Sequence, residues 1–456
     1  MVNDSRPTTS LKSIHIRGLF EIFDYDINYA TDGNVLILTG ANGFGKTQVL
    51  NIIYSLFNRK FSFFHQLVFS EIFIHLNNGT QINISKVKGS QVIQESLFEM
   101  DENEPVEDVK IEFIQNNKSV ESFLLNKLIP SNMIDRLENY LHVSRLGDEV
   151  WFDHFHDEEL NLTQVIQRYG SELPLSYRKN INKFEIGEIS NSILNSMQVH
   201  LIEEQRLFKK VNSSSIGIRN RSEKNQTVMT ETVNAYAEEL TLLINKKMRE
   251  SFSISQELDR TYPRRLITAR DTITQSEYDK RFDHLSSKID KLARNGLHEG
   301  MQETLAYNEE DSKALSVYLS DSEKKLRVFD DLLEKLELFT SILNERRFTF
   351  KSIVIDKEKG FYFQTDRGKK LQLSDLSSGE QHELVMLYEL IFKTSKGILV
   401  LIDEPEISLH VTWQKEFLDD LLKIIELQDF QVLLATHSPS IINDRWDLVY
   451  TLEKKL

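Results

Sequence analysis

The sequence predicts an α/β fold in which two strand-containing lobes are separated by a helical insertion. Residues 11–85 hold short runs of β-branched and aromatic residues broken by turn signals. From about residue 230 to 346, apolar side chains recur at helical spacing. After residue 347 strands return and then alternate with helices. We therefore expect an N-terminal lobe over 1–205, a helical insertion over 206–346 and a C-terminal lobe over 347–456.

The composition is that of a folded protein without disulfide bonds. The chain has 456 residues, of which 40% are hydrophobic, so it can bury a core and is not disordered throughout. It contains no Cys, which excludes a disulfide scaffold, a Cys-ligated zinc site and a thiol nucleophile. No apolar run approaches the roughly 18–20 residues that span a bilayer. The first residues lack the apolar core of a signal peptide. We expect a cytoplasmic protein with no membrane partner.

The formal net charge is −15. Proteins that bind the phosphate backbone over a wide surface are usually basic, because Lys and Arg displace condensed counterions. Broad, non-specific DNA binding is therefore not favoured, although a local basic groove remains compatible with this charge.

The N-terminal lobe is expected to contain two hairpins and a strand–loop–helix unit. Residues 11–17 and 20–29, broken at Gly18, predict the first hairpin. Val35 to Leu38 is a continuous apolar run, as in a strand buried on both faces, and the helical spacing of 47–57 follows it. The remaining elements expected in this lobe are strands over 71–76, 80–85 and 199–202 and an acidic solvated loop over 98–108. Beyond the lobe, a linker is expected over 212–228.

The insertion and the C-terminal lobe follow in order. From Leu326 to Leu343 one apolar stripe at i, i+3 and i+4 spacing predicts a helix, and the length allows only a short helical hairpin. The C-terminal lobe is expected to hold strands over 348–356, 360–364, 398–402, 431–435 and 447–452 and helices over 379–393 and 411–427.

The segment from Gly40 to Thr47 matches G-x-x-x-x-G-K-[ST] in full and lies between an apolar strand and a helix, as this motif requires. The glycines allow backbone N–H groups to surround a polyphosphate. Lys46 would reach the β- and γ-phosphates of ATP, and the Thr47 hydroxyl would ligate Mg²⁺. The predicted ATP-binding residues are Gly40, Asn42, Gly43, Gly45, Lys46, Thr47 and Gln48.

A second apolar run, Ile398 to Ile402, ends in the two carboxylates Asp403 and Glu404. This is the Walker B arrangement. Asp403 would hold Mg²⁺, and Glu404 would polarise the water that attacks the γ-phosphate. The sequence thus predicts an enzyme that hydrolyses ATP.

The run Leu376-Ser-Ser-Gly-Glu-Gln381 precedes this strand, and here the sequence resembles ABC-type ATPases with their LSGGQ signature. The resemblance implies an ABC-ATPase head: a mixed sheet with a P-loop core and an antiparallel β lobe, interrupted by the helical insertion. In that family the signature of one subunit caps the γ-phosphate bound to another. The residues carried over are Ser377, Ser378, Gly379, Glu380 and Gln381. Taken alone, this run would be an ordinary helix N-cap.

Four further assignments follow from the same resemblance. His437 in Thr-His-Ser-Pro matches the switch histidine, which contacts the γ-phosphate and positions water. Gln205 occupies the place of the Q-loop residue that senses Mg²⁺, against the alternative of a surface Gln. Phe20 and Phe23 are candidates for stacking on adenine, although a place in the core is the better explanation of both. The segment from Glu406 to His410 fills the D-loop position.

The order of motifs, from about residue 11 to 452, resembles RecF/SMC-like ATPases rather than membrane transporters. The runs 401–414 and 435–444 look like OLD-type and other AAA-labelled ATPases of bacterial anti-phage defence. The chain ends soon after His437, so no C-terminal TOPRIM nuclease is expected, unlike in OLD-type enzymes. It has no Cys pair for a zinc hook. Among stand-alone ATPases it most resembles the AriA ATPases of PARIS systems, with the PtuA ATPases of Septu systems as a near alternative.

This resemblance implies a homodimer or larger homo-oligomer in which two subunits enclose ATP and Mg²⁺. It also implies a separately encoded nuclease partner, TOPRIM-type (AriB-like) or HNH-type, which the ATPase restrains until a phage anti-restriction protein triggers its release in abortive infection. An acidic trigger would need a basic patch, for which Arg260, Arg264, Arg265 and Arg270 are candidates, although a solvated helix face is the better explanation of these four residues.

Two other functions are compatible with the motifs. A RecF-like DNA-repair ATPase would bind duplex DNA directly, which the negative charge and the short insertion disfavour. A nucleotide-gated scaffold would bind ATP with little hydrolysis, and for that role Glu404 would be unnecessary.

Overall fold

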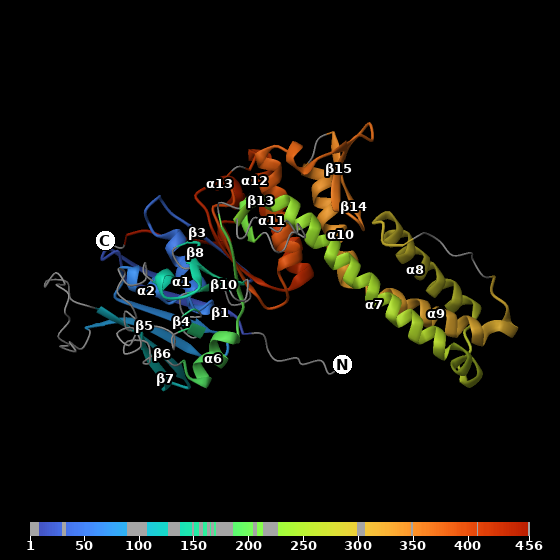
Figure 1. The fold of residues 1–456 in the computed structure, drawn as a ribbon, viewed down its shortest axis with the longest axis horizontal. Coiled ribbons are helices and arrows are strands. Elements are labelled where there is room, and N and C mark those ends of the chain that lie inside the picture. Colours follow the sequence, from blue (N-terminus) through green and yellow to red (C-terminus); the bar gives the residue numbers. More distant parts are fainter. Residues whose placement is uncertain are drawn as a thin grey trace. The chain divides into compact units, whose positions relative to one another are not determined.

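The chain folds into two compact units (Figure 1). The first combines Met1–Glu204 with Thr394–Ile407 and Gln414–Leu456, so both ends of the chain contribute to it. The second contains Gln205–Lys393 and Ser408–Trp413. The computed structural model describes residues 9–29, 33–88, 107–125, 137–147, 150–154, 158–161, 165, 168–169, 186–203, 208–212, 227–298, 306–347, 350–407 and 409–454.

A five-stranded sheet forms the centre of the first unit, and every pairing in it is parallel. Its order is β11 (Val199–Ile202), β17 (Leu399–Asp403), β18 (Gln431–Ala435), β3 (Val35–Thr39) and β19 (Val449–Thr451). All five residues of β17 are buried, as expected of a central strand that is covered on both faces. In a parallel sheet the carboxyl ends of the strands share one edge, so the loops after β3, β17 and β18 start from the same side.

An antiparallel six-stranded sheet forms the other layer of this unit. Its order is β2 (Phe23–Asn28), β1 (Leu11–Leu19), β4 (Glu71–Leu76), β5 (Gln81–Lys88), β6 (Glu107–Gln115) and β7 (Lys118–Leu125). Alternate residues of its strands, such as Ile14, Ile16, Ile72 and Ile74, are buried in one hydrophobic cluster with residues of the parallel sheet. A smaller antiparallel sheet contains β8 (Val143–Arg145), β9 (Val150–Asp153) and β10 (Glu158–Asn161).

Helix α1 (Lys46–Phe57) belongs to the same core, and its buried side chains include Val49, Leu50 and Ile53. It packs against β11, β17 and β18. Because buried residues occupy most of its circumference, the helix is fixed between neighbours and holds the loop before it in place. Among the described residues, the other helices of the unit are α2 (Ser62–Gln66), α6 (Glu188–Asn195) and α13 (Pro439–Ile442), with short 3₁₀ turns at Leu137–Asn139 and Trp446–Leu448. Helix α12 (Val411–Gln428) lies mostly within this unit.

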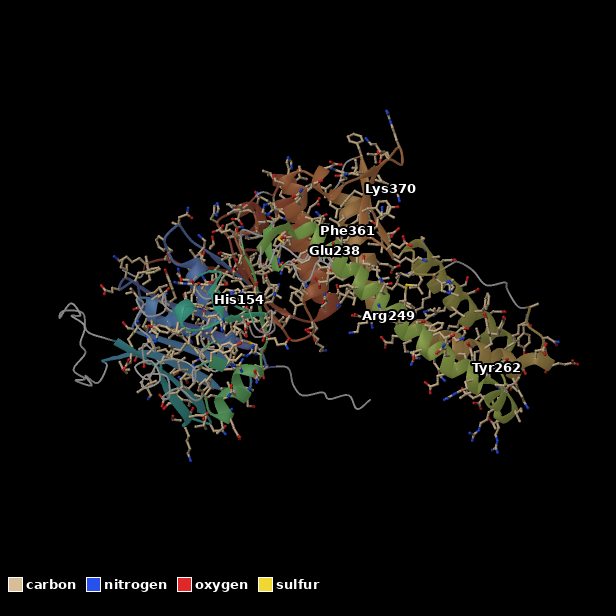
Figure 2. All side chains as sticks on the ribbon, viewed as in Figure 1. His154, Glu238, Arg249, Tyr262, Phe361 and Lys370 are labelled. Carbon is tan, nitrogen blue, oxygen red and sulfur yellow. The ribbon has the colours of Figure 1, made fainter. Side chains whose placement is uncertain are left out.

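The second unit contains a long helical arm. Helix α7 (Thr232–Thr268) has 37 residues and runs beside α9 (Ser312–Arg327), which also packs against α8 (Gln275–Arg294) (Figure 1). Arg249 and Tyr262 mark successive positions along α7 (Figure 2). Ion pairs join these helices: Arg265 with Asp321, Arg281 with Glu323, Lys325 with Asp259.

The base of this unit is an aromatic core that holds α11 (Ser378–Tyr388). Tyr236 of α7 stacks on Tyr388 with 4.4 Å between ring centroids, and Phe339 and Phe361 pack edge-on or tilted around them. The contributing elements are α10 (Asp330–Ile342), β14 (Lys351–Asp356), β15 (Gly360–Thr365) and β16 (Lys370–Leu371), with π turns at Leu343–Arg347 and Glu389–Lys393. The described part of this unit also contains the 3₁₀ turns Glu309–Asp311 and Leu373–Asp375 and the strand pair β12 (Phe208–Asn212) and β13 (Thr227–Glu231).

The predicted fold class, a P-loop sheet and an antiparallel lobe interrupted by a helical insertion, is confirmed. Some predicted element boundaries are wrong. Strand β1 continues through Gly18, and the turn follows at residues 20–22. The apolar stripe from Leu326 to Leu343 belongs to the end of α9 and to α10 rather than to one helix. Within the described part of the chain, none of the helices combines the length and the apolar character needed to cross a bilayer.

Candidate active site

The predicted phosphate loop lies between the end of β3 and the start of α1. Gly40, Gly43 and Gly45 all have positive φ, at 151°, 88° and 83°. A Cβ atom on Gly40 would lie 2.8 Å from the Leu452 carbonyl oxygen, and one on Gly45 would lie 2.9 Å from Leu19. Gly40 therefore requires glycine on steric as well as conformational grounds, and Gly45 requires it on conformational grounds. Around Gly43 there is open space within 4 Å, so its side of the loop is free for a ligand to approach.

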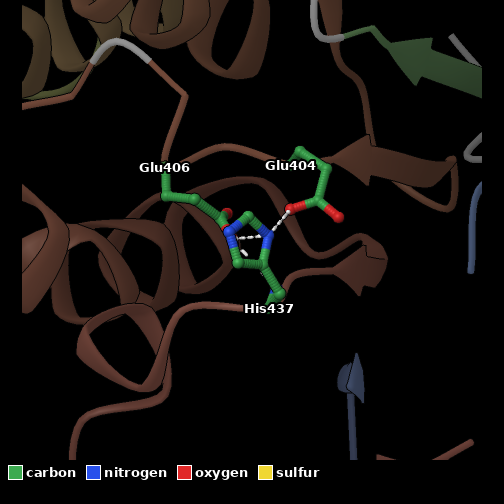
Figure 3. Close-up of side chains that lie close together, drawn as sticks. All are labelled: Glu404, Glu406 and His437. Atoms are coloured by element: carbon green, nitrogen blue, oxygen red, sulfur yellow. Dashed lines mark hydrogen bonds and ion pairs between the residues drawn. The ribbon is translucent and has the colours of Figure 1, made fainter. Parts of the chain in front are cut away.

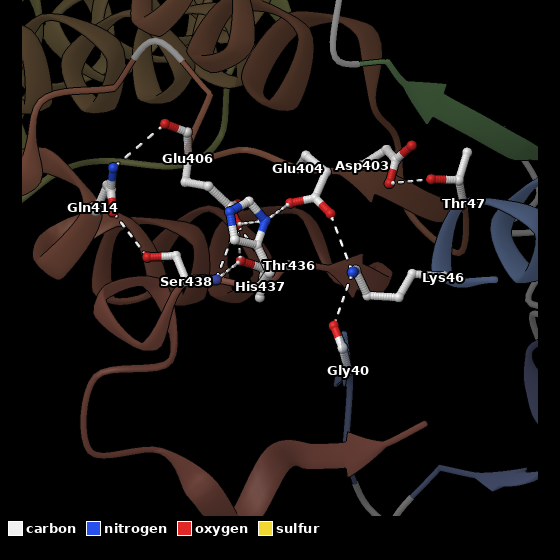
Figure 4. Close-up of polar contacts among 10 residues, drawn as sticks. All are labelled: Gly40, Lys46, Thr47, Asp403, Glu404, Glu406, Gln414, Thr436, His437 and Ser438. Atoms are coloured by element: carbon white, nitrogen blue, oxygen red, sulfur yellow. Dashed lines mark hydrogen bonds and ion pairs between the residues drawn. The ribbon is translucent and has the colours of Figure 1, made fainter. Parts of the chain in front are cut away.

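Lys46 begins α1 and extends back along this loop. Its side chain is only 5% exposed, and its Nζ donates to the Gly40 carbonyl oxygen at 3.0 Å and lies 3.5 Å from Glu404 Oε1 (Figure 4). A buried ammonium group needs anionic or carbonyl partners. Phosphate oxygens entering the glycine loop would provide such partners, so the residues present fit a polyphosphate ligand.

Thr47 and Asp403 offer two oxygen ligands at the same place. The Thr47 hydroxyl donates to Asp403 Oδ1 at 3.3 Å, across a sequence separation of 356 residues (Figure 4). A hydroxyl and a carboxylate are hard oxygen donors of the kind that Mg²⁺ prefers, and Mg²⁺ usually keeps several waters besides one or two protein ligands. The donor set therefore fits this ion. Gln48, the next residue of α1, has a buried side-chain oxygen with no hydrogen-bond partner among the described residues.

Glu404 follows β17 directly and has a left-handed backbone, with φ of 42°. Its carboxylate lies 2.6 Å from His437 Nδ1 (Figure 3) and also faces Lys46. Burial raises the pKa of this carboxyl group, and the neighbouring Glu406 carboxylate raises it further, while His437 and Lys46 act in the opposite direction. The group is thereby shifted towards the pKa of a useful general base at neutral pH.

His437 comes from the loop after β18, and 53% of its side chain is exposed. Its Nδ1 lies between two carboxylates, 2.6 Å from Glu404 and 3.1 Å from Glu406 (Figure 3). One nitrogen and two carboxylate oxygens of these three residues lie within 4.8 Å of one another, so the cluster could also hold a cation. The exposed side of the imidazole is accessible to a ligand bound at the phosphate loop.

The predicted signature residues lie in the second unit, at the start of α11. Ser377 is the N-cap: its hydroxyl accepts from the Glu380 N–H, and Glu380 accepts from the Ser377 N–H at 2.8 Å. Lys351 contacts Glu380 at 2.8 Å. Burial would raise the pKa of Glu380, but the hydrogen bonds from Lys351 and Ser377 hold it below its ordinary value. The reciprocal bonds of Ser377 and Glu380 make this a capped helix start, and the Gln381 amide also donates to the Leu376 carbonyl at 3.1 Å.

The weaker predictions have mixed outcomes. Phe23 is buried and packs with Tyr25 and Phe44, so it is a core residue. Phe20, by contrast, is 37% exposed, and a Cβ on Gly45 would lie 3.5 Å from its ring. It is thus available beside the phosphate loop. Gln205 lies outside the described residues, as do residues 98–106 of the predicted acidic loop and 213–226 of the predicted linker.

Sequence reasoning did not identify the role of Glu406. Its carboxylate is buried beside His437 and accepts hydrogen bonds from the loop that carries the histidine. The contacts join residues about 30 positions apart, which no local pattern reveals. The polar residues on both sides of His437, Thr436 and Ser438, are the only hint in the sequence that this loop has a polar anchor.

Comparison with known proteins gives a family. Residues 10–442 match the profile described as AAA ATPase domain (AAA_15). This range covers the phosphate loop, the end of β17, the signature segment and His437. No curated protein matches the chain.

Solved structures similar to the chain include SMC head domains. One is the Smc head domain with an extended coiled coil bound to the C-terminal domain of ScpA, from Pyrococcus furiosus, at 12% identity and a TM-score of 0.35, covering 98% of this chain and 94% of that one. Another is the SMC head domain from Thermotoga maritima, at 11% identity and a TM-score of 0.32, covering 97% and 94%.

Proposed function

Because the chain belongs to the AAA ATPase domain family, it is an ATP-hydrolysing P-loop enzyme, and we propose that its catalytic site is built from the loops after β3, β17 and β18. The observation that carries the proposal is the meeting of Lys46, Thr47, Asp403, Glu404 and His437 at one edge of the parallel sheet. These residues come from both ends of the sequence, yet each lies within 3.5 Å of another member of the group.

The binding roles follow from charge and geometry. Lys46 and the glycine loop bind the β- and γ-phosphates of ATP, since the buried ammonium group lies along this loop, against the Gly40 carbonyl oxygen. Thr47 and Asp403 hold Mg²⁺. When bound, this ion neutralises charge on the phosphate oxygens. Phe20, exposed beside Gly45, provides an apolar surface for adenine.

The hydrolytic roles belong to Glu404 and His437. Glu404 accepts a proton from the attacking water, a role supported by its raised pKa and its partial burial. His437 holds the Glu404 carboxylate through Nδ1 and directs its exposed side towards the γ-phosphate. Such pairs are effective because the groups are oriented before the reaction begins.

We further propose that two copies of the chain enclose ATP between them. In this arrangement the partner's Ser377 and the partner's Gly379 cover the γ-phosphate with a helix N-terminus. The order of the motifs supports this proposal, as does the position of Ser377 at the start of α11. Binding and hydrolysis would then change how the two subunits are held together.

The biological role that we propose is the sensor and scaffold of an anti-phage defence complex. ATP-dependent assembly would hold a separately encoded nuclease inactive and release it when a phage protein is sensed. The resemblance of residues 401–414 and 435–444 to defence ATPases supports this, and the net charge of −15 disfavours the alternative of a DNA-repair ATPase. Of the candidate basic patch, Arg265 is engaged with Asp321, whereas Arg260, Arg264 and Arg270 are exposed.

Two substitutions test the site. We expect Lys46→Ala to abolish ATP binding and Glu404→Gln to keep binding while lowering the hydrolysis rate by about 100-fold or more, because only the second removes a group used in the chemical step. Binding is measured by calorimetry and turnover by phosphate release. The matched control is Lys60→Ala. Lys60 follows the same helix, and its ammonium group lies over the Tyr54 ring. Normal ATP affinity in Lys46→Ala would refute the assignment.

The biological role needs a separate experiment. The tagged chain is purified from its native cell, and the product of the adjacent gene is sought in the eluate at stoichiometric amount. A nuclease there, TOPRIM-type or HNH-type, that is silent while bound supports the defence role. An ATPase rate that rises several-fold with duplex DNA, together with the absence of such a partner, would favour DNA repair instead.

A further inference from the structure

We propose that Glu406 is a positioning residue that fixes the loop Thr436–Ser438 and thereby aims His437 at Glu404. The proposal rests on the roles given above to Glu404 and His437. Among the described residues, Glu406 contacts neither the phosphate loop nor its Lys46. Glu406 therefore acts only through the residues that it holds.

One oxygen of Glu406 accepts hydrogen bonds from three polar groups of this loop. Glu406 is 8% exposed, and its Oε1 accepts from the Thr436 hydroxyl at 2.6 Å, the His437 N–H at 2.9 Å and the Ser438 N–H at 3.0 Å (Figure 4). Hydrogen bonds to a buried carboxylate are short and about twice as strong as those between neutral groups. Three at one atom hold three consecutive residues in a single arrangement.

The same carboxylate also lies beside the imidazole. His437 Nδ1 is 3.1 Å from Glu406 Oε1 and 2.6 Å from Glu404 Oε2 (Figure 3). Glu406 therefore contacts both the backbone and the side chain of His437. The ring of His437 is otherwise half-exposed, so these contacts determine which rotamer its side chain adopts.

Gln414 of α12 supports the loop from a second direction. The Ser438 hydroxyl donates to Gln414 Oε1 at 2.9 Å, and the Gln414 amide donates to the Glu406 carbonyl at 3.4 Å (Figure 4). The segment after β17 and the loop after β18 are thus tied to one helix. Such outer supports commonly decide whether a catalytic group stands in a productive geometry.

A purely structural role explains this arrangement poorly. Two carboxylates, Glu404 and Glu406, lie around one imidazole, and Glu406 Oε2 is buried without a hydrogen-bond partner in the part of the chain that is described. Burying an extra negative charge costs free energy that an apolar residue would avoid. Such a cost is typical of sites where geometry serves the reaction.

The test compares variants of Glu406 and of its hydroxyl donor. We expect Glu406→Ala to lower kcat for ATP hydrolysis by about 100-fold, the effect of a misplaced catalytic group. Thr436→Val, which removes one donor at a fully buried position without changing its shape, should lower kcat by about tenfold, and Thr436→Ser should restore it. KM for ATP should stay within about twofold throughout, because binding depends on the phosphate loop.

Glu406→Gln keeps an acceptor oxygen and loses only the charge, so it provides an intermediate kcat if Glu406→Ala fails to fold. The proposal is overturned if Glu406→Gln and Thr436→Val both retain kcat within about twofold, or if KM rises in parallel with the loss of kcat. Glu404→Gln and His437→Ala serve as references. If these two hydrolyse ATP at the wild-type rate, the proposed catalytic site is wrong; if they are inactive and only the Glu406 and Thr436 variants behave normally, the positioning role alone fails.

Discussion

Glu404 adopts a backbone conformation that an L-residue enters only at a cost. Its φ of 42° lies in the left-handed region, where a residue with a long side chain is disfavoured by about 1–3 kcal/mol. The strain is held by two backbone hydrogen bonds, from its own N–H to the Ala435 carbonyl and from the Ile407 N–H to its carbonyl. The strand ends abruptly there, and the carboxylate turns towards Lys46 and His437.

Thr47 gives a prediction at the scale of one hydroxyl group. If Thr47 and Asp403 hold Mg²⁺ together, Thr47→Ala should raise the Mg²⁺ concentration for half-maximal ATP hydrolysis by about tenfold or more, whereas Thr47→Ser should leave it close to wild type. A magnesium titration of the ATPase rate measures this. Equal magnesium dependence in the Ala and Ser variants would mean that the hydroxyl is not a ligand.

At the scale of residues, the sequence predicts which residues meet when they are close along the chain, and it does so less well when they are far apart along the chain. The glycines and Lys46 form a contiguous motif, and Asp403 and Glu404 follow one apolar run, so local patterns place both groups at strand ends. The anchor from Glu406 to Thr436 joins two loops, and its geometry depends on the register of β17 beside β18. Neither that register nor the left-handed turn at Glu404 has a local signature.

At the scale of elements, the two helix starts implicated in phosphate binding differ. Helix α1 begins after Gly45 with no side-chain cap and no acidic residue in its first turn, so its first N–H groups are left for an anion. Helix α11 is closed by the capping box of Ser377 and Glu380. A phosphate reaching α11 would have to compete with Glu380, whereas one reaching α1 meets no such competitor.

The helical arm gives a prediction about one ion pair. Arg265 of α7 donates to the buried Asp321 of α9, with one contact at 2.7 Å. Arg265→Ala leaves that carboxylate without its cation, which costs about 3–5 kcal/mol when a pair is fully buried and less for this partly exposed one. We expect amides of α9 around Asp321 to exchange with solvent at least about tenfold faster.

Arg264→Ala is the control for that measurement, because the neighbouring arginine is exposed. Equal protection of α9 in the Arg265→Ala and wild-type chains would show that the pair adds nothing to helix packing. The comparison also separates structural arginines from those free to bind an acidic partner.

Predicted element types agree with the structure better than predicted element boundaries. The apolar stripe from Leu326 to Leu343 has continuous helical spacing, but the chain leaves the helix at Val328 and Phe329 and starts again at Asp330. Two acidic residues in the first turn of α10 favour a new start there. Gly18 signals a break but is tolerated inside β1, because the bulge between β1 and β2 takes up the irregularity.

At the scale of the whole molecule, the parallel sheet is assembled from distant parts of the chain. Strand β3 comes from the N-terminal part, whereas its neighbours β18 and β19 come from the last 30 or so residues of the fold. The chain leaves the first unit after Glu204 and returns at Thr394. Everything between, including the signature segment, belongs to a separate unit. The catalytic groups and the proposed lid are therefore carried by different units of the same chain.

This division leads to a prediction about pairs of inactive chains. If the lid acts across two subunits, Lys46→Ala and Ser377→Arg chains, each inactive alone, should form mixed dimers with one intact site and, on random pairing, regain about a quarter of wild-type activity. Co-expression followed by phosphate-release measurements tests this. Lys46→Ala with Glu404→Gln is the control, because both changes lie in the first unit and no mixed site is whole. Failure of the first pair to recover, or recovery by the control pair, would contradict a site shared between subunits.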